Sequence, residues 1–202
     1  KKILKNFLQF ISSYLEVSEC IYDEKMLSTD IPDAEVFITG SDQVWGGILR
    51  PNYLCFVPEG KLKISYAASF GKAEIPKEQL NVIAPWIRRL DYISVRESSG
   101  KEICNHQIGV HAEKVLDPTL LIEGSQYPVD YKIASALEKF CFGYFLNFDD
   151  NQKDILAAID GFSTRQDIKI LYAACASNID RFVPQKSKVY LSPEEWIGMY
   201  QK

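Results

Sequence analysis

The chain has 202 residues, 47% of them hydrophobic and 25% charged, which is an ordinary globular composition with length for one large domain or two small ones. Its formal net charge is −4, and because a nucleic-acid partner usually requires a basic face, the charge argues against nucleic-acid binding. The five cysteines are widely spaced without a CxxC pair, so they indicate neither a disulfide framework nor a zinc site. No apolar run approaches the ~20 residues of a membrane span, and we expect no transmembrane segment.

The first part of the chain alternates between predicted strands and helices. Apolar residues at helical spacing predict an amphipathic helix over residues 1–16. The strands that follow are predicted at 35–39, 61–69, 91–95 and 113–117, and the helices at 75–90 and 99–109. In the second of these helices, Ser99 and Glu102 have the spacing of a capping box. Strands that alternate with helices indicate βα units, and therefore a mostly parallel sheet covered on both faces.

The pattern loosens over residues 123–135, which we interpret as a domain boundary or a linker. The alternation then returns, with strands predicted at 139–148, 168–174 and 188–192 and helices at 151–162 and 192–200. Ser192, Pro193 and Glu195 form an ideal helix start with a capping box. Because a three-stranded parallel sheet buries little by itself, we expect the second domain to be incomplete here or completed by another chain.

Polar residues follow each of the first four predicted strands. These strand ends are Gly40-Ser41-Asp42-Gln43, Ser69-Phe70-Gly71, Arg96-Glu97-Ser98 and Asp117-Pro118-Thr119. Open parallel sheets bind ligands in the crevice outside the carboxyl ends of their strands. If the four strands lie side by side, we expect these groups to converge on one rim of the sheet.

The loop after the first strand suits a neutral polyhydroxyl ligand. The pair Gly40-Ser41 at a helix start could hold a phosphate, but Asp42 in the same turn would repel an anion. Asp42 and Gln43 can instead exchange hydrogen bonds with sugar hydroxyls, and Trp45 can stack against a sugar ring. The structural alternatives are that Ser41 or Asp42 caps a short helix, and that Trp45 belongs to the core, as most tryptophans do.

The other strand ends contain one candidate for binding an anion. The planar guanidinium of Arg96 can bind a carboxylate or a phosphate through two N–H groups. The alternative is that Arg96 only pairs with an acidic neighbour such as Glu97, a contact that contributes little when it is exposed. For Asp117-Pro118 the alternative is that the pair only forms a turn. The alternative for residues 69–71 is also that they only form a turn.

Four motifs, FITGSDQVW, KISYAASFG, DYISVRESSG and VLDPTLL, in this order and spacing, resemble the polysaccharide pyruvyl transferases. The resemblance covers about residues 35–122, and SPEEWIGMY fits a later helix of the same family. It implies Rossmann-like parallel sheets in a two-domain, glycosyltransferase-B-like architecture. On that architecture, residues 1–122 are the latter part of the N-terminal domain, 123–135 are the linker, and 136–202 are the first part of the C-terminal domain. The chain is then truncated at both ends.

The resemblance also implies an activity. It is the transfer of a pyruvyl group from phosphoenolpyruvate to sugar hydroxyls of a polysaccharide or a lipid-linked glycan precursor, which forms a ketal. Neither a metal nor an organic cofactor is implied, and the place of action is the cytoplasm or the inner face of the cytoplasmic membrane. The catalytic candidates are Arg96, for the charge of the donor, and Asp42, for the acceptor hydroxyl. The substrate-binding candidates are Gly40, Ser41, Gln43, Trp45, Ser69, Phe70 and Asp117.

The chain departs from the family pattern in three places, one of which is the Gly/Asn-rich strand–helix opening expected before residue 1. The chain also has Gly46-Gly47 where members often have Asn-Pro, and the acid/base histidine motif is expected beyond residue 202. We therefore expect this segment to be inactive on its own. Two alternatives stay open: a nucleotide-sugar glycosyltransferase of similar architecture, and a non-catalytic remnant that binds glycans. The sequence specifies neither the acceptor sugar nor the oligomeric state.

Overall fold

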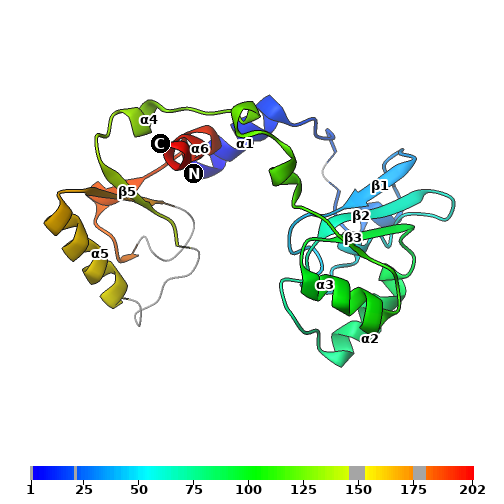
Figure 1. The fold of residues 1–202 in the computed structure, drawn as a ribbon. Helices are drawn as coiled ribbons and strands as arrows, with labels where there is room; N and C mark the ends of the chain where they lie inside the picture. The colour runs from blue at the N-terminus through cyan, green and yellow to red at the C-terminus, as the bar shows by residue number, and fades with distance from the viewer. Residues whose placement is uncertain (1, 21, 146–152, 175–180) are drawn as a thin grey trace. The chain divides into compact units, whose positions relative to one another are not determined.

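The structure is a computed structural model that describes residues 2–20, 22–145, 153–174 and 181–202 (Figure 1). The chain divides into two compact units. One unit contains residues 20–123, and the other contains residues 1–19 together with residues 124–202. In this division the helix predicted at 1–16 groups with residues 124–202, whereas the prediction from the sequence places it with the first domain.

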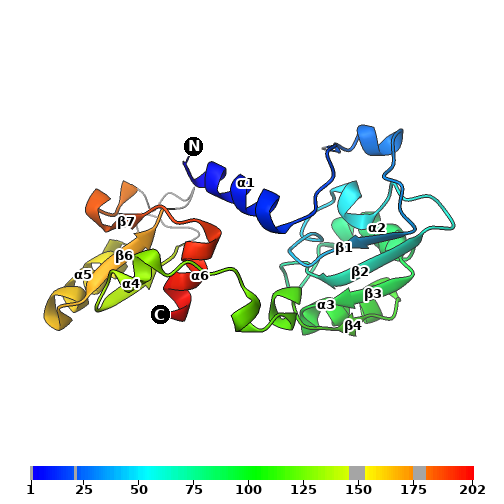
Figure 2. The ribbon, with the colours of Figure 1, turned by 90° about the horizontal axis from the view of Figure 1, so that it is seen from above.

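The unit of residues 20–123 contains a four-stranded, all-parallel sheet with the strand order β1-β2-β3-β4 (Figure 2). The strands are β1 (Val36–Thr39), β2 (Leu62–Ala68), β3 (Tyr92–Val95) and β4 (Glu113–Lys114). The helices are α2 (Lys77–Ile87) and α3 (Ser98–Glu102), the latter continuing as a π-helix (Ile103–Ile108). Short 3₁₀ helices span Met26–Ser28, Arg50–Tyr53 and Pro118–Leu121. The predicted βα alternation and parallel sheet are confirmed.

Both α2 and α3 lie on the same side of this sheet (Figure 1). Right-handed crossovers between strands taken in sequential order place every crossover helix on one face. The buried core of the unit lies between that face and the helices, around Trp45, Ile83 and Ile103. On the opposite face Ile38 and Tyr92 lie at the same level of the sheet, and each is 64% exposed. The prediction that both faces are covered is therefore wrong within this unit.

The start of α3 differs from the prediction. The helix begins at Ser98 with Glu97 at the N-cap position, and no side chain caps its first turn. The capping box predicted for Ser99 and Glu102 is therefore wrong. The Glu97 side chain instead accepts a hydrogen bond from Arg96. It therefore contacts a residue at the carboxyl end of β3 rather than the first turn of α3.

The second unit contains a three-stranded parallel sheet with the order β5-β6-β7. Its strands are β5 (Phe140–Gly143), β6 (Lys169–Ala173) and β7 (Lys188–Val189), and its helices are α1 (Lys2–Tyr14), α4 (Lys132–Ser135), α5 (Lys153–Gln166) and α6 (Pro193–Gln201). Alternate residues of β6 face opposite sides, so Tyr172 packs with α5 and Leu171 packs with α6. The end of the predicted strand 139–148 and the start of the helix 151–162 fall at positions 146–152, outside the described residues.

The helix α6 begins as the sequence predicts. The Ser192 hydroxyl accepts the N–H of Glu195, and the Glu195 carboxylate accepts the N–H of Ser192. The preceding segment is packed against this helix, because the Asp130 N–H donates to the Glu194 carbonyl oxygen at 3.0 Å. A Cβ at Gly198 would collide with the carbonyl oxygen of Asp130, so this contact requires glycine. Residues 124–135 are thus part of this unit, and the division between the two units falls at residues 123 and 124, where the predicted boundary stretch begins.

Within the part of the chain that the structure describes, no helix combines the length and the apolar character needed to cross a bilayer.

Candidate functional site

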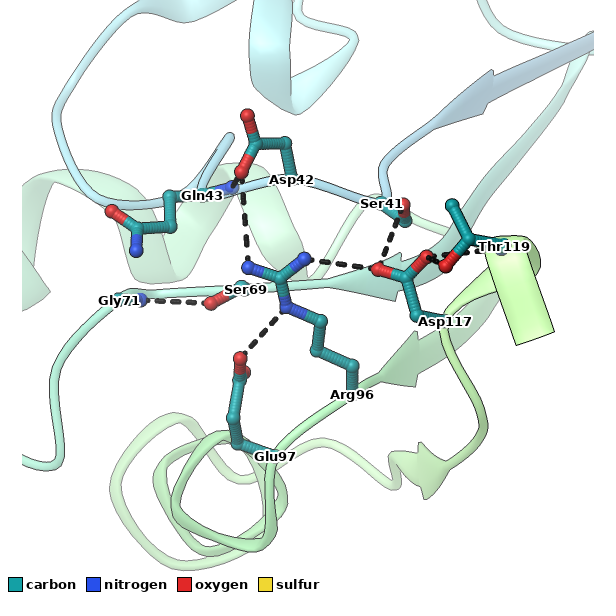
Figure 3. A network of polar contacts seen from close by, with 9 residues as sticks. All are labelled: Ser41, Asp42, Gln43, Ser69, Gly71, Arg96, Glu97, Asp117 and Thr119. Atoms are coloured by element: carbon teal, nitrogen blue, oxygen red, sulfur yellow. Dashed lines mark hydrogen bonds and ion pairs between the residues drawn. The ribbon is translucent and has the colours of Figure 1, made fainter. Parts of the chain in front are cut away.

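The carboxyl ends of the four parallel strands meet at one edge of the sheet in the unit of residues 20–123, as the sequence predicts (Figure 3). Ser41 and Asp42 follow β1, and Ser69 and Gly71 follow β2. Arg96 and Glu97 follow β3, and Asp117 and Thr119 come after β4. Side chains from the loops after β1, β3 and β4 form one polar network around the guanidinium of Arg96.

Three carboxylates surround Arg96. Its Nε–H donates to Glu97 Oε1 at 2.8 Å, and its Nη1–H donates to Asp117 Oδ2 at 3.0 Å. Its Nη2 lies 3.7 Å from Asp42 Oδ1, which is an ion pair beyond hydrogen-bond distance. The hydrogen bonds to Glu97 and then Asp117 raise the pKa of Arg96, so this side chain is a permanent cation.

Asp117 connects the loops after β1, β3 and β4. Its Oδ1 accepts the N–H of Thr119 at 3.0 Å and the Thr119 hydroxyl at 2.8 Å. Its Oδ2 accepts from Arg96 and also from the Ser41 hydroxyl at 3.3 Å. These donors, the Thr119 N–H first, lower the pKa of Asp117 to about 2, so the carboxylate is ionised at neutral pH. Asp117 also caps the 3₁₀ helix Pro118–Leu121, which confirms its predicted turn role alongside its place in the cluster.

The loop after β1 is pressed against the neighbouring strand. Gly40 has a φ of +133°, and a Cβ there would collide with the carbonyl oxygen of Tyr66, so only glycine fits. The Asp42 carbonyl oxygen accepts the N–H of Ser69 at 3.2 Å, which joins this loop to the end of β2. Residues 41–47 form turns and bends rather than a helix, so the helix-cap interpretation of Ser41 and Asp42 is wrong.

Trp45 belongs to the core. Its side chain is 0% exposed, stacks on Tyr53 at 6.0 Å and 4° between ring planes, and packs against Phe70 at 5.2 Å. Its Nε1–H donates to the carbonyl oxygen of Asn52 at 3.2 Å. The burial of Trp45 and Phe70 favours a core role for both over contact with a ligand at the rim. Their packing fixes the path of the two loops instead.

The side chains of Ser69 and Gln43 also have local roles. Ser69 is 0% exposed, and its Oγ accepts the N–H of Gly71 at 2.9 Å, which makes the turn that the sequence allowed. The Gln43 side chain lies over Gly71, where a Cβ would come within 2.8 Å of its Oε1. The structure therefore places Ser41, Asp42, Arg96 and Asp117 in the polar cluster, and Ser69 and Gly40 in its framework.

The family model for polysaccharide pyruvyl transferases matches residues 2–202, essentially the whole chain. The chain belongs to the polysaccharide pyruvyl transferase family. Comparison with curated proteins and with solved structures gave no match. Membership confirms the resemblance carried by the four motifs, and it points to an enzyme of the pyruvyl transferase class that acts on a polysaccharide.

Two residues of this polar cluster are absent from the residues that the sequence singles out as candidates. Glu97 provides the shortest hydrogen bond to Arg96, and Thr119 donates twice to Asp117. Both had a signal in the sequence. Glu97 is adjacent to the candidate arginine. In Asp117-Pro118-Thr119, the aspartate has the spacing at which its side chain accepts a hydrogen bond from the residue two positions on. The geometry that places Glu97 on Nε could not be predicted from this adjacency.

The charge of the cluster limits what it can bind. One guanidinium faces three carboxylates, so the cluster carries more negative than positive charge. Carboxylates accept hydrogen bonds from sugar hydroxyls, whereas a guanidinium binds carboxylates and phosphates. The cluster thus combines an acceptor surface for a polyhydroxyl ligand with a single cationic group for an anion.

Proposed function

We propose that this pyruvyl transferase moves a pyruvyl group from phosphoenolpyruvate to sugar hydroxyls of a polysaccharide or a lipid-linked glycan precursor, and that a ketal is formed. The observation that carries the proposal is the cluster around Arg96, where a cation oriented by Glu97 and Asp117 lies beside the exposed carboxylate of Asp42. Such a site offers one group to an anionic donor and another to a hydroxylated acceptor.

The chemistry of the donor assigns roles to these groups. Protonation of the enol carbon of phosphoenolpyruvate makes C2 electrophilic, a sugar hydroxyl attacks it with a general base assisting, and phosphate leaves when a second hydroxyl closes the ketal. We propose that Arg96 contacts the phosphate or carboxylate of the donor and stabilises its charge. We propose that Asp42 orients the acceptor hydroxyl or accepts its proton. This reaction needs neither a metal nor an organic cofactor.

The wider setting is part of the same proposal. We propose that the two units correspond to Rossmann-like domains of a glycosyltransferase-B-like architecture. Because phosphoenolpyruvate is a metabolite of the cytoplasm, the protein would act there or at the inner face of the cytoplasmic membrane. Family membership and the parallel sheet in each unit support this proposal.

A thermal-shift comparison tests the donor. A ligand that binds only the native state stabilises it and therefore raises the melting temperature. At a hundredfold excess of ligand over its Kd, the free energy of unfolding rises by roughly 2.7 kcal/mol. We expect phosphoenolpyruvate to raise the melting temperature of the wild type and of Arg165→Gln, a charge-matched control in the other unit. We expect no rise for Arg96→Gln. A rise with nucleotide-sugars and none with phosphoenolpyruvate would favour a glycosyltransferase instead.

A further inference from the structure

The three carboxylates around Arg96 hold it unequally. Glu97 and Asp117 make hydrogen bonds of 2.8 and 3.0 Å, on side chains that are 40% and 22% exposed. The Asp42 carboxylate is 90% exposed and lies 3.7 Å from Nη2. Among the described residues, Asp42 is the polar partner of Nη2. Two carboxylates therefore orient the guanidinium, and the third only neutralises its outer end.

We infer that the Asp42 carboxylate is a replaceable counter-ion of Arg96, which an arriving phosphate or carboxylate group displaces from Nη2. This inference rests on the proposed function, because it concerns how the donor's anion reaches Arg96. Asp42 would then lower the affinity of the site for anions, and it would be released toward the acceptor only when an anion has bound.

The local structure permits this exchange. The Asp42 backbone is fixed, since its carbonyl oxygen accepts the N–H groups of Ser69 and Val44. Its side chain has a second partner, because Oδ1 also accepts the N–H of Gln43 at 2.7 Å. Rotation away from Arg96 therefore breaks this one hydrogen bond and an exposed ion pair, and exposed pairs of this kind are weak. Asp117 cannot move as easily, because Thr119 and Ser41 also donate to it.

Charge repulsion acts in the same direction. With Asp42 in place, an anion that approaches Nη2 meets a carboxylate at the position it must occupy. Once the anion is bound, repulsion pushes the Asp42 carboxylate outward. The carboxylate proposed to serve the sugar hydroxyl is thus paired while the anion site is empty and unpaired when it is filled, so anion binding would precede productive acceptor binding.

Titration with inorganic phosphate, at low and fixed ionic strength, tests this inference without turnover. Asn is isosteric with Asp and keeps an oxygen for the Gln43 N–H, so Asp42→Asn removes the charge and little else. We expect Asp42→Asn to bind phosphate about twofold to fivefold more tightly than the wild type, the range for loss of one exposed ion pair. Asp33→Asn, which removes a carboxylate before the other end of β1, should leave the affinity unchanged.

The dependence on Arg96 completes the test. Adding Arg96→Gln to Asp42→Asn should abolish the gain. Equal or weaker phosphate binding by Asp42→Asn, or no binding by either protein in the millimolar range, overturns the inference. If Arg96-dependent binding of phosphoenolpyruvate is seen but Asp42→Asn does not tighten it, the inference fails and the proposed donor stands. If phosphate binding tightens but phosphoenolpyruvate does not bind, the donor is wrong and the counter-ion role stands.

Discussion

Replacement of Trp45 distinguishes between two roles for this side chain, as part of the core or as a platform that stacks against a ligand. We expect Trp45→Ala to destabilise the unit of residues 20–123 strongly, because the whole indole is buried against Tyr53 and Phe70. A platform residue would behave in the opposite way, with ligand affinity lost and stability kept. The milder variant Trp45→Phe keeps an aromatic ring and removes the indole N–H and part of the buried volume.

The structure gives the size of the effect. Truncation of a fully buried tryptophan to alanine costs about 3–5 kcal/mol from lost burial and the cavity left behind. The lost indole hydrogen bond adds little, because its acceptor, the Asn52 carbonyl oxygen, also accepts the Thr39 hydroxyl at 2.8 Å and stays satisfied. We expect about 1–2 kcal/mol for Trp45→Phe, from the smaller volume lost.

The assay must report on one unit, since a chain with two units need not unfold in a single transition. Hydrogen exchange of peptides from β2, measured across a urea series, follows the unit of residues 20–123 alone. An unfolding free energy within about 1 kcal/mol of the wild type for Trp45→Ala would refute the core assignment. Loss of the folded state in Trp45→Ala leaves Trp45→Phe to give the measurable value.

Three further predictions follow from the described contacts. Gly40→Ala should lower the free energy of unfolding by about 1–3 kcal/mol, because the φ of Gly40 is +133° and a Cβ there would collide with the neighbouring strand. The control Gly47→Ala, which has open space around it, should be neutral in the same urea assay. Ser192→Ala should cost about 1 kcal/mol through loss of the capping box, seen as faster hydrogen exchange in α6 and not in β2. Asp117→Asn should flatten the acid limb of the stability curve. The native pKa of this carboxyl is about 2, below its ordinary value of 3.8, so its contribution is present above about pH 4 and is lost as the pH falls toward 2. Equal acid sensitivity of the wild type and Asp117→Asn, by circular dichroism from pH 5 to 2, would contradict the assignment.

The sequence was sufficient for the sheet in the first unit and for the place of its site. Hydrophobic runs and turn residues locate β1 to β4, and parallel strands in sequence order bring their polar ends to one edge. The start of α6 was also predictable, because a capping box is a local device whose partners, Ser192 and Glu195, are three residues apart.

Features that depend on distant contacts could not be predicted. Whether Trp45 is core or platform depends on the packing of Tyr53 and Phe70, which no local pattern specifies. The capping box predicted for Ser99 is absent because the N-cap position is occupied by Glu97, two residues earlier. The helix at 1–16 has an amphipathic pattern that fits any apolar partner. Its grouping with residues 124–202 therefore could not be predicted from the sequence.

The most direct test of the proposed function follows the carbon that would become the ketal. Phosphoenolpyruvate labelled with ¹³C at C2 is incubated with the intact protein, as its native cell makes it, and with glycans from the same cell. We predict a new ketal ¹³C resonance on the glycan together with release of inorganic phosphate, retained in Asp33→Asn and lost in Arg96→Gln. Phosphate release without transfer of the label to glycan, or a full ketal signal in Arg96→Gln, would contradict the account.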